Sequence, residues 1–281
     1  MTEQNTNPLA SYFRMPGLNV QLPTGGAFLP EGTFTANPDG TVPIYPMTAA
    51  DEYLLKNPDA LLSGFAIQKM LESCVPAIKN VSLISTPDLD VLLLAIRAVT
   101  YGNTMEVSTT CPKCTRANDY QADLPSLLQT VKQIPTENSV RLTDDLVVFL
   151  RPYSFANATQ VSLLTYNETR RLQAIEQNGA TQEVIDQERR VSMQKIVALQ
   201  SAILADCIVK VVTPGGEVDS AEHIVEFMAN ISRAWVSLME AEIAKIMELG
   251  MDKTLPVKCQ AVACGHEWNT QIEFDPSNFF E

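Results

Sequence analysis

Two cysteine pairs, Cys111–Cys114 and Cys259–Cys264, lie far apart in this sequence, with residues 115–258 between them. Each pair is flanked by two short runs of alternating polar and apolar residues, which is the pattern of a β-hairpin. A tetrahedral zinc site can be formed by four cysteine thiolates, two from each of two turns. A single ion bound by both pairs would hold the start and the end of the intervening segment together, so these cysteines constrain the architecture of the whole chain.

The two pairs differ in their spacing. The first has the C-x2-C spacing that is usual for a zinc knuckle, whereas the second is C-x4-C. Gly265 directly follows the second pair and permits a tight turn whose N–H groups can point at a sulfur. We expect one structural zinc ion with four ligands, namely Cys111, Cys114, Cys259 and Cys264.

Three alternatives remain open for these residues. His266 lies two positions after Cys264, and its imidazole could replace Cys259 as a ligand. The thiols could be free or incidentally paired. A thiol oxidoreductase would need a helix N-terminus directly after a strand to lower a thiol pKa, whereas residues 115–118 predict the return strand of a hairpin. Because a structural zinc site is closed, it implies no water activation.

Length and charge limit the class of protein. The chain has 281 residues, of which 46% are hydrophobic, so it can bury one large core or two small ones. It carries 33 acidic and 20 basic residues, a formal net charge of −13, and no basic run. Nucleic acid and anionic membranes are therefore poor partners. No signal peptide or 18-residue apolar run is present, so we expect a soluble protein made and kept in the cytosol, where paired cysteines are more often metal ligands than disulfides.

Residues 1–47 predict an extended arm. Seven prolines and five glycines in this segment forbid long helices and favour turns. The arm also carries large apolar side chains, whose combined surface is too large to leave in water. These residues are Phe13, Leu18, Val20, Leu22, Phe28, Leu29 and Phe34. We expect it to wrap around its own domain or a neighbouring subunit.

The remainder is mainly helical. Helices are predicted over 49–56, from Pro58 to Cys74, over 86–101, 125–133 and 154–178, from 181 to near 211, and over 220–230 and 232–248. Short strands are predicted over 105–110, 118–124, 139–142, 146–151, 255–258 and 268–274. The helix from 181 has a polar N-terminal half, which we expect to project from the core or pack on another chain. Cys74 lies on an apolar helix face and is expected to be a packing residue.

These elements predict an α+β fold, with a mainly helical body, an extended N-terminal arm and a discontinuous, zinc-ribbon-like pair of β-hairpins. The expected parts are the arm (1–47), the helical body (48–104), the first ribbon hairpin (105–124), a mainly helical insertion with a short hairpin (125–254), and the second ribbon hairpin with an aromatic tail (255–281).

No catalytic constellation is found in the sequence. It has two histidines, and His223-Ile-Val-Glu226 is not the H-E-x-x-H of a zinc protease. Asp88 and Asp90 resemble a carboxylate pair, but a position in the first turn of a helix behind Thr86 explains them. There is no nucleophile elbow, P-loop or dinucleotide fingerprint. We therefore expect no enzyme and no small-molecule substrate.

The chain resembles the baseplate hub and hub-assembly proteins of T-even-type contractile-tailed bacteriophages. Three blocks carry the resemblance through their order and spacing: Phe13–Leu18 with Leu22–Phe28, Tyr45–Gly64 with Ile96–Gly102, and Cys264–Trp268 with Phe274–Phe280.

The resemblance implies a structural protein at the base of a phage tail, located in the virion and bound to other baseplate and tail proteins in an oligomeric assembly. It also implies an alternative, an assembly chaperone that is absent from the mature virion. A nucleic-acid-binding zinc-ribbon protein is a rival class, and the net charge of −13 argues against it.

Overall fold

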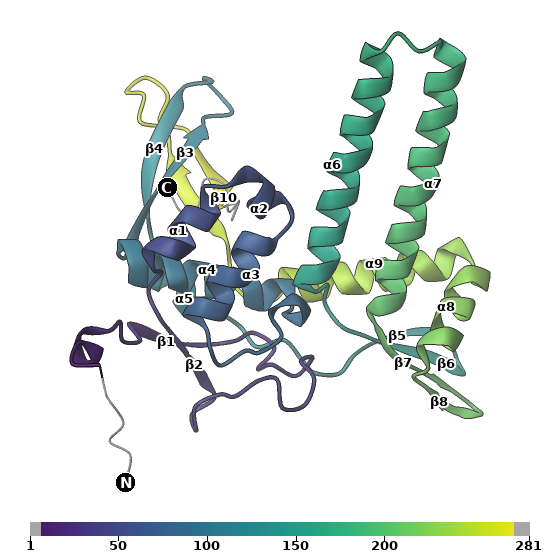
Figure 1. The fold of residues 1–281 in the computed structure, drawn as a ribbon, viewed down its shortest axis with the longest axis horizontal. Helices are drawn as coiled ribbons and strands as arrows, with labels where there is room; N and C mark the ends of the chain where they lie inside the picture. Colours follow the sequence, from purple (N-terminus) through teal and green to yellow (C-terminus); the bar gives the residue numbers. More distant parts are fainter. Residues whose placement is uncertain (1–6, 273–281) are drawn as a thin grey trace.

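The computed structural model describes residues 7–272 of the chain (Figure 1). Helices and small antiparallel sheets are mixed along it, as the predicted α+β class requires. Two separate hydrophobic cores organise the described residues. The expected aromatic tail, residues 274–280, lies outside the described part of the chain.

Helix α4 (Thr86–Tyr101) is the centre of the first core. Every residue from Pro87 to Ala98 except Asp90 is buried, because a helix that is apolar on all sides must be covered on all sides. The other elements of this body are α1 (Ala49–Leu55), α2 (Pro58–Leu62), α3 (Phe65–Cys74), α5 (Leu124–Gln129), β1 (Leu18–Gln21) and β2 (Thr41–Ile44). Cys74 is fully buried in this core, as expected of a packing residue.

The segment predicted as one helical face from Pro58 to Cys74 is broken in two. Gly64 separates α2 from α3 and has a left-handed backbone, with φ of 73°. A Cβ at this position would lie 2.9 Å from Thr159 in the first of the two long helices. The break thus allows the base of that long helix to approach this body closely.

Two further sequence predictions change at the start of α4. Ser85, not Thr86, is the N-cap, and its hydroxyl accepts a hydrogen bond from the N–H of Asp88. Asp88 is buried and accepts hydrogen bonds from both the backbone and the hydroxyl of Thr24. Asp90 forms an ion pair with Lys253. Both carboxylates therefore have structural contacts.

From strand β1 onward, the N-terminal arm covers its own body. Strands β1 and β2 pair in antiparallel register, with Val20 opposite Val42. Both valines are buried, as are Leu22 and Ile44, and all four belong to the first core. Of the two expected locations, this segment takes the one on its own domain.

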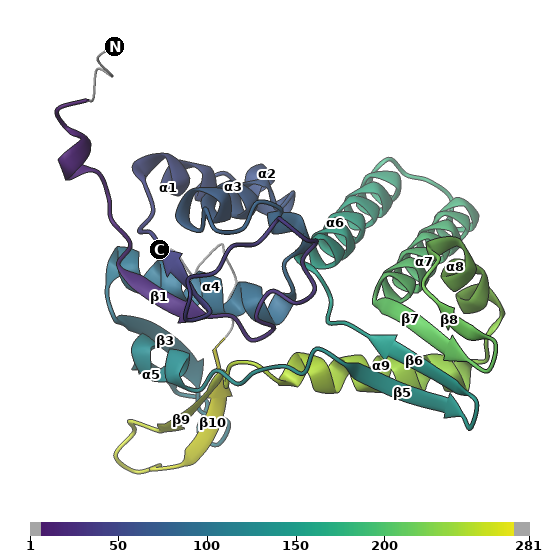
Figure 2. The same ribbon diagram turned by 90° about the horizontal axis from the view of Figure 1, so that it is seen from below.

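The second core lies within the predicted helical insertion and contains more sheet than predicted. Strands β5 (Asn138–Thr143), β6 (Leu146–Leu150), β7 (Ile208–Thr213) and β8 (Gly216–Val218) form one antiparallel sheet in that order. Helices α8 (Ala221–Asn230) and α9 (Arg233–Glu248) belong to the same core (Figure 2).

The predicted helix from 181 to near 211 is wrong at its end. Helix α7 stops at Asp206, and the β-branched run that follows forms β7, which pairs with β6. This segment forms a central strand of the sheet instead of continuing the helix, because Ile208 and Val211 are buried in that position.

Helices α6 (Phe155–Gln177) and α7 (Gln182–Asp206) form an antiparallel hairpin that projects away from both cores (Figure 1). Gly179, with φ of 74°, lies in the connection at its far end. The polar N-terminal half of α7 lies in the projecting part, where one of its faces packs against α6 and the other faces solvent.

Candidate metal centre

Two β-hairpins from distant parts of the chain carry the four cysteines. Strands β3 (Thr104–Thr110) and β4 (Ala117–Asp123) form the first hairpin, and β9 (Thr254–Lys258) and β10 (Glu267–Gln271) form the second. In each hairpin the first cysteine directly follows the first strand, and the second cysteine lies three residues before the next strand. The two tips face each other.

The two turns share a backbone plan despite their different lengths. The N–H of Cys111 donates to the carbonyl of Arg116 (2.9 Å), and the N–H of Cys259 donates to the carbonyl of His266 (2.8 Å). Each acceptor lies two positions after the second cysteine of its pair. The residue between them is left-handed in both turns, with φ of 58° at Thr115 and 54° at Gly265. The longer C-x4-C loop is thus accommodated without changing the ends of the turn.

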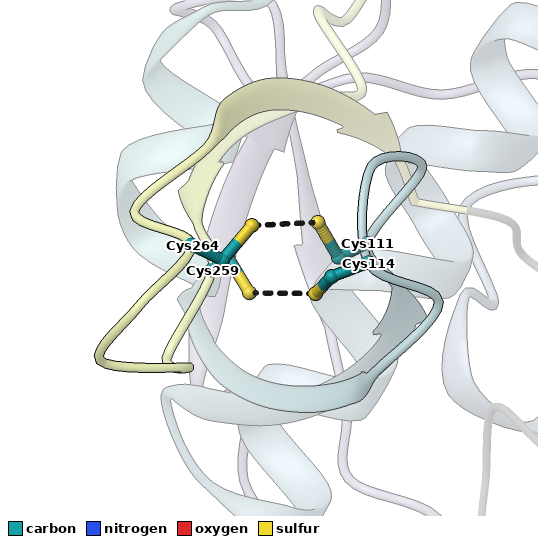
Figure 3. A group of neighbouring side chains, drawn as sticks. All are labelled: Cys111, Cys114, Cys259 and Cys264. Carbon is teal, nitrogen blue, oxygen red and sulfur yellow. Dashed lines mark hydrogen bonds between the residues drawn. The ribbon is translucent and has the colours of Figure 1, made fainter.

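The four sulfur atoms form one cluster (Figure 3). All four Sγ atoms lie within 4.8 Å of one another. The Sγ atoms of Cys111 and Cys264 are 3.9 Å apart, and those of Cys114 and Cys259 are 3.5 Å apart. Four thiolates around one zinc ion at Zn–S distances of about 2.3 Å would be separated by about 3.8 Å. The donor set and its spacing therefore fit a tetrahedral metal ion.

The N–H groups of the turns lower the pKa values of the cysteine thiols, whereas the neighbouring sulfurs raise the pKa of Cys259. Burial raises the pKa of Cys111, but hydrogen bonds from the N–H groups of Cys114 and Lys113 outweigh it and lower the pKa to about 7. The N–H of Ala261 lowers the pKa of Cys259, whereas burial and the neighbouring thiols raise it to about 11. The cluster thus favours ionisation of Cys111 and resists further negative charge, a balance that a bound cation would shift toward ionisation.

His266, the alternative ligand, lies apart from the sulfur cluster. Its ring stacks on Trp268 with the ring centroids 6.0 Å apart. The group of potential metal ligands within mutual reach consists of the four cysteines without a histidine.

Contacts that the sequence did not reveal also join the two hairpins. The hydroxyl of Tyr120 donates to the carbonyl of Lys258 (2.8 Å), and the backbone N–H of Gln260 donates to the side chain of the buried Asn118 (2.8 Å). No spacing rule could have paired these residues, because the partners lie on opposite hairpins.

The other two cysteines lie elsewhere. Cys74 is in the first core and Cys207 in the second, and burial raises the pKa of each thiol to about 12. Within residues 7–272, the four-cysteine cluster is the one group of three or more Cys, His, Asp or Glu side chains placed to hold a metal ion. In the same residues, each helix is too short or too polar to cross a bilayer.

The donor set suits a structural site. Four protein sulfurs around one metal ion would complete a tetrahedral coordination shell and would leave no open position for a substrate or water. The site joins two hairpins whose sequences are separated by the second core and the α6–α7 hairpin, so a bound ion would hold these hairpins together.

Comparison with known proteins adds the family. Residues 15–281 match the family model described as T4 bacteriophage base plate protein. Searches of the curated proteins and of the solved structures both found no match. Because the family model covers nearly the whole chain, this protein belongs to the T4 bacteriophage base plate protein family.

Proposed function

We propose that the protein is a non-enzymatic structural component of the phage tail baseplate, located at or next to the hub, where it holds neighbouring subunits together. The observation that carries this proposal is the α6–α7 hairpin, which projects away from the two hydrophobic cores (Figure 1). Several apolar side chains on it are exposed, including Val184, Met193 and Val197. A projecting surface of this kind is suited to contact other subunits.

The first test locates the protein. Quantitative mass spectrometry of purified virions should find it in a fixed ratio to other baseplate proteins. The alternative function, an assembly chaperone, predicts that the protein is present in infected cells and in assembly intermediates but absent from mature particles. That result would overturn the structural role.

The cysteine cluster is proposed to hold one structural zinc ion. Support comes from the all-sulfur donor set and the S···S distances of 3.5 and 3.9 Å. Elemental analysis of the purified chain should give one zinc per chain, and Cys114→Ser together with Cys259→Ser should abolish this zinc content. His266→Ala should leave it unchanged. Loss of zinc in the histidine variant would assign the alternative ligand.

The net charge of −13 supports a role in protein contacts over binding to nucleic acid. Gel-shift measurements at low salt should show no retardation of DNA or RNA. Retardation that weakens as salt increases would favour the rival zinc-ribbon class.

A further inference from the structure

Strand β1 has one free edge. Among residues 7–272 it pairs with β2 alone, in a sheet of two strands. Asn19 lies opposite Pro43, which has no N–H, so these two residues cannot exchange ladder hydrogen bonds. In an antiparallel pair, the N–H and C=O of such a residue point away from the partner strand. The backbone groups of Asn19 and the alternate residue Gln21 are therefore directed to the free edge, where both residues are exposed.

A groove of about 630 Å³ lies along this edge, between β1, α4 and the region of α5. Apolar side chains line much of it, including Val91, Val99, Leu128 and Val131. The polar side chains that line it are amides, among them Asn103 and Gln129, and no charged residue is present. Because burying an unpaired charge is costly, this groove selects an uncharged, apolar occupant. An unpaired strand edge beside such a groove is the arrangement used to add an extended peptide as a further strand.

The chain itself carries a segment with the matching chemistry. Residues 7–13, Asn-Pro-Leu-Ala-Ser-Tyr-Phe, contain no charged side chain, although the whole chain has a net charge of −13. Leu9, Tyr12 and Phe13 are 61%, 83% and 58% exposed. This segment, termed the free arm, extends away from the body (Figures 1 and 2). Its apolar side chains are therefore left largely uncovered by the part of the chain that the structure describes. The free arm contains one 3-10 turn, η1 (Ala10–Tyr12), which has no buried residue and would have to open for the arm to add as a strand.

The free arm is directed away from its own groove. Arg14 donates to the carbonyl and the hydroxyl of Ser73, each at 2.8 Å, and to the carbonyl of Pro46. Both acceptors lie on the side of β2 and α3, across the strand pair from the groove beside α5. Arg14 thus holds residues 7–13 on the opposite side of the β1–β2 pair, so these residues do not reach the groove of their own chain.

We propose that the groove at the free edge of β1 binds the free arm, residues 7–13, of a second copy of this chain as an added strand. The proposal deepens the assembly role proposed above, on which it rests, by naming the partner of the arm. Because arm and groove are different surfaces on opposite sides of one strand pair, two copies can exchange arms reciprocally as a dimer, or successive copies can form a ring or an open chain.

The decisive experiment is a photo-cross-link between two distinguishable copies. One copy carries p-benzoylphenylalanine in place of Tyr12, and the other is uniformly labelled with ¹⁵N. After irradiation of the mixture, mass spectrometry should find Tyr12 of the first copy joined to residues 91–103 or 125–131 of the labelled copy. Sedimentation should show a concentration-dependent higher mass for the full chain and a monomer after deletion of residues 1–13.

A matched pair of variants separates docking from folding. Gln129→Arg places a cation in the uncharged groove and should reduce the cross-link by at least about fivefold, because the charge must be desolvated when the arm binds. Gln121→Arg makes the same substitution at an exposed site on β4 outside the groove and should leave the cross-link unchanged. Equal effects of the two variants, cross-links elsewhere on the second copy or only within one chain, or a monomeric full chain would each overturn the proposal.

These outcomes are distinct from failure of the proposed function. A protein found in virions whose Tyr12 cross-links to a different tail protein would keep the baseplate role and overturn the exchange between copies. A protein absent from virions that still shows the cross-link between copies in solution would do the reverse.

Discussion

Thr115 and Gly265 have the same left-handed backbone in the two cysteine turns, although glycine alone adopts it without steric cost. The φ values are 58° and 54°. For a β-branched residue this conformation costs about 1–2 kcal/mol. The glycine in the second turn was visible in the sequence as a turn signal, whereas nothing in the letters of the first turn indicated that Thr115 is held in the same conformation.

Thr115→Gly should therefore stabilise the protein. Relief of the backbone strain exceeds the added entropy of glycine in the unfolded chain, and we expect a net gain of about 0.5–1 kcal/mol, or a rise in Tm of about 2 °C. Thr110→Gly is the control, because Thr110 lies in the extended strand β3 and gains nothing from glycine. Thermal melts followed by circular dichroism would contradict the argument if both variants lowered Tm equally.

At the scale of single residues, the four cysteines could be grouped from sequence because the chemistry of zinc requires two pairs on two turns. The position of His266 could not be decided in the same way. Its distance from the cluster depends on the direction in which β10 leaves the turn and on the stacking against Trp268, and neither follows from spacing along the chain.

Among the elements, the α6–α7 hairpin is held by charges as well as by apolar contacts. The carboxylate of the buried Glu168 accepts hydrogen bonds from Arg171 of its own helix (2.8 and 3.0 Å) and from Lys195 of α7 (2.7 Å). Arg171 also pairs with Glu188 of α7. These contacts fix the register of the two helices, because sliding one helix by a turn would separate the buried Glu168 from Lys195 and Arg171 from Glu188.

Glu168→Gln should destabilise the hairpin by about 1–2 kcal/mol, because two charge-assisted contacts are lost. The hydrogen bond from Lys195 is the largest cause that lowers the pKa of Glu168, from an ordinary value of 4.5 to about 2. A lowered carboxyl pKa stabilises the folded state above the ordinary value, and this stabilisation is lost as pH falls from about 4.5 toward 2. Denaturant melts should therefore show a wild-type advantage at pH 7 that shrinks steadily below pH 4.5.

Glu176→Gln provides the comparison for that experiment. Glu176 pairs with Arg189 nearer the tip of the hairpin, and both side chains are well exposed, so the loss should be below about 0.5 kcal/mol. An equal loss in both variants, or an advantage of the wild type that does not depend on pH, would show that the Glu168 cluster does not hold the hairpin.

Most helices could be predicted from sequence because their caps and apolar periodicity are local. In the second core, the β5 and β6 strands could be predicted as well, but the pairing of β6 with β7 could not be. These two strands are separated by the whole α6–α7 hairpin, and their pairing is decided by burial of Val148 and Val211 on one face. Pairing with the distant strand β6 is also the reason why the helix that begins near 181 ends at Asp206 and not near 211. Local patterns thus indicated which segments are regular, and tertiary packing decided which of them meet.

For the whole molecule, the cysteine cluster is one of several links between the ends of the segment from 115 to 258. The N–H of Lys132 donates to the carbonyl of Gly250 (2.7 Å), and the N–H of Ile134 donates to the carbonyl of Pro23 (2.7 Å). The N–H of Thr86 donates to the carbonyl of Tyr153 (2.8 Å). These bonds lie near the base of the segment, whereas the cysteines lie at the tips of β3–β4 and β9–β10. A metal ion bound by the cysteines would therefore organise the two hairpins without being the only connection to the second core.

Removal of the metal should loosen the two hairpins and leave both cores folded. Because metal binding contributes folding free energy where the ligands are, we expect amide hydrogen exchange in residues 104–123 and 254–271 to accelerate at least about tenfold in chelator or in Cys114→Ser. Exchange in α4 and in β5–β8 should be unchanged, since their protection comes from apolar burial. Cys207→Ser is the control, because it places a hydroxyl in the second core and should accelerate exchange in β6 and β7 instead. If exchange rose uniformly over the chain after chelation, the metal-bound cysteine cluster would hold the whole fold. If exchange at the two hairpins did not change, no metal would hold them.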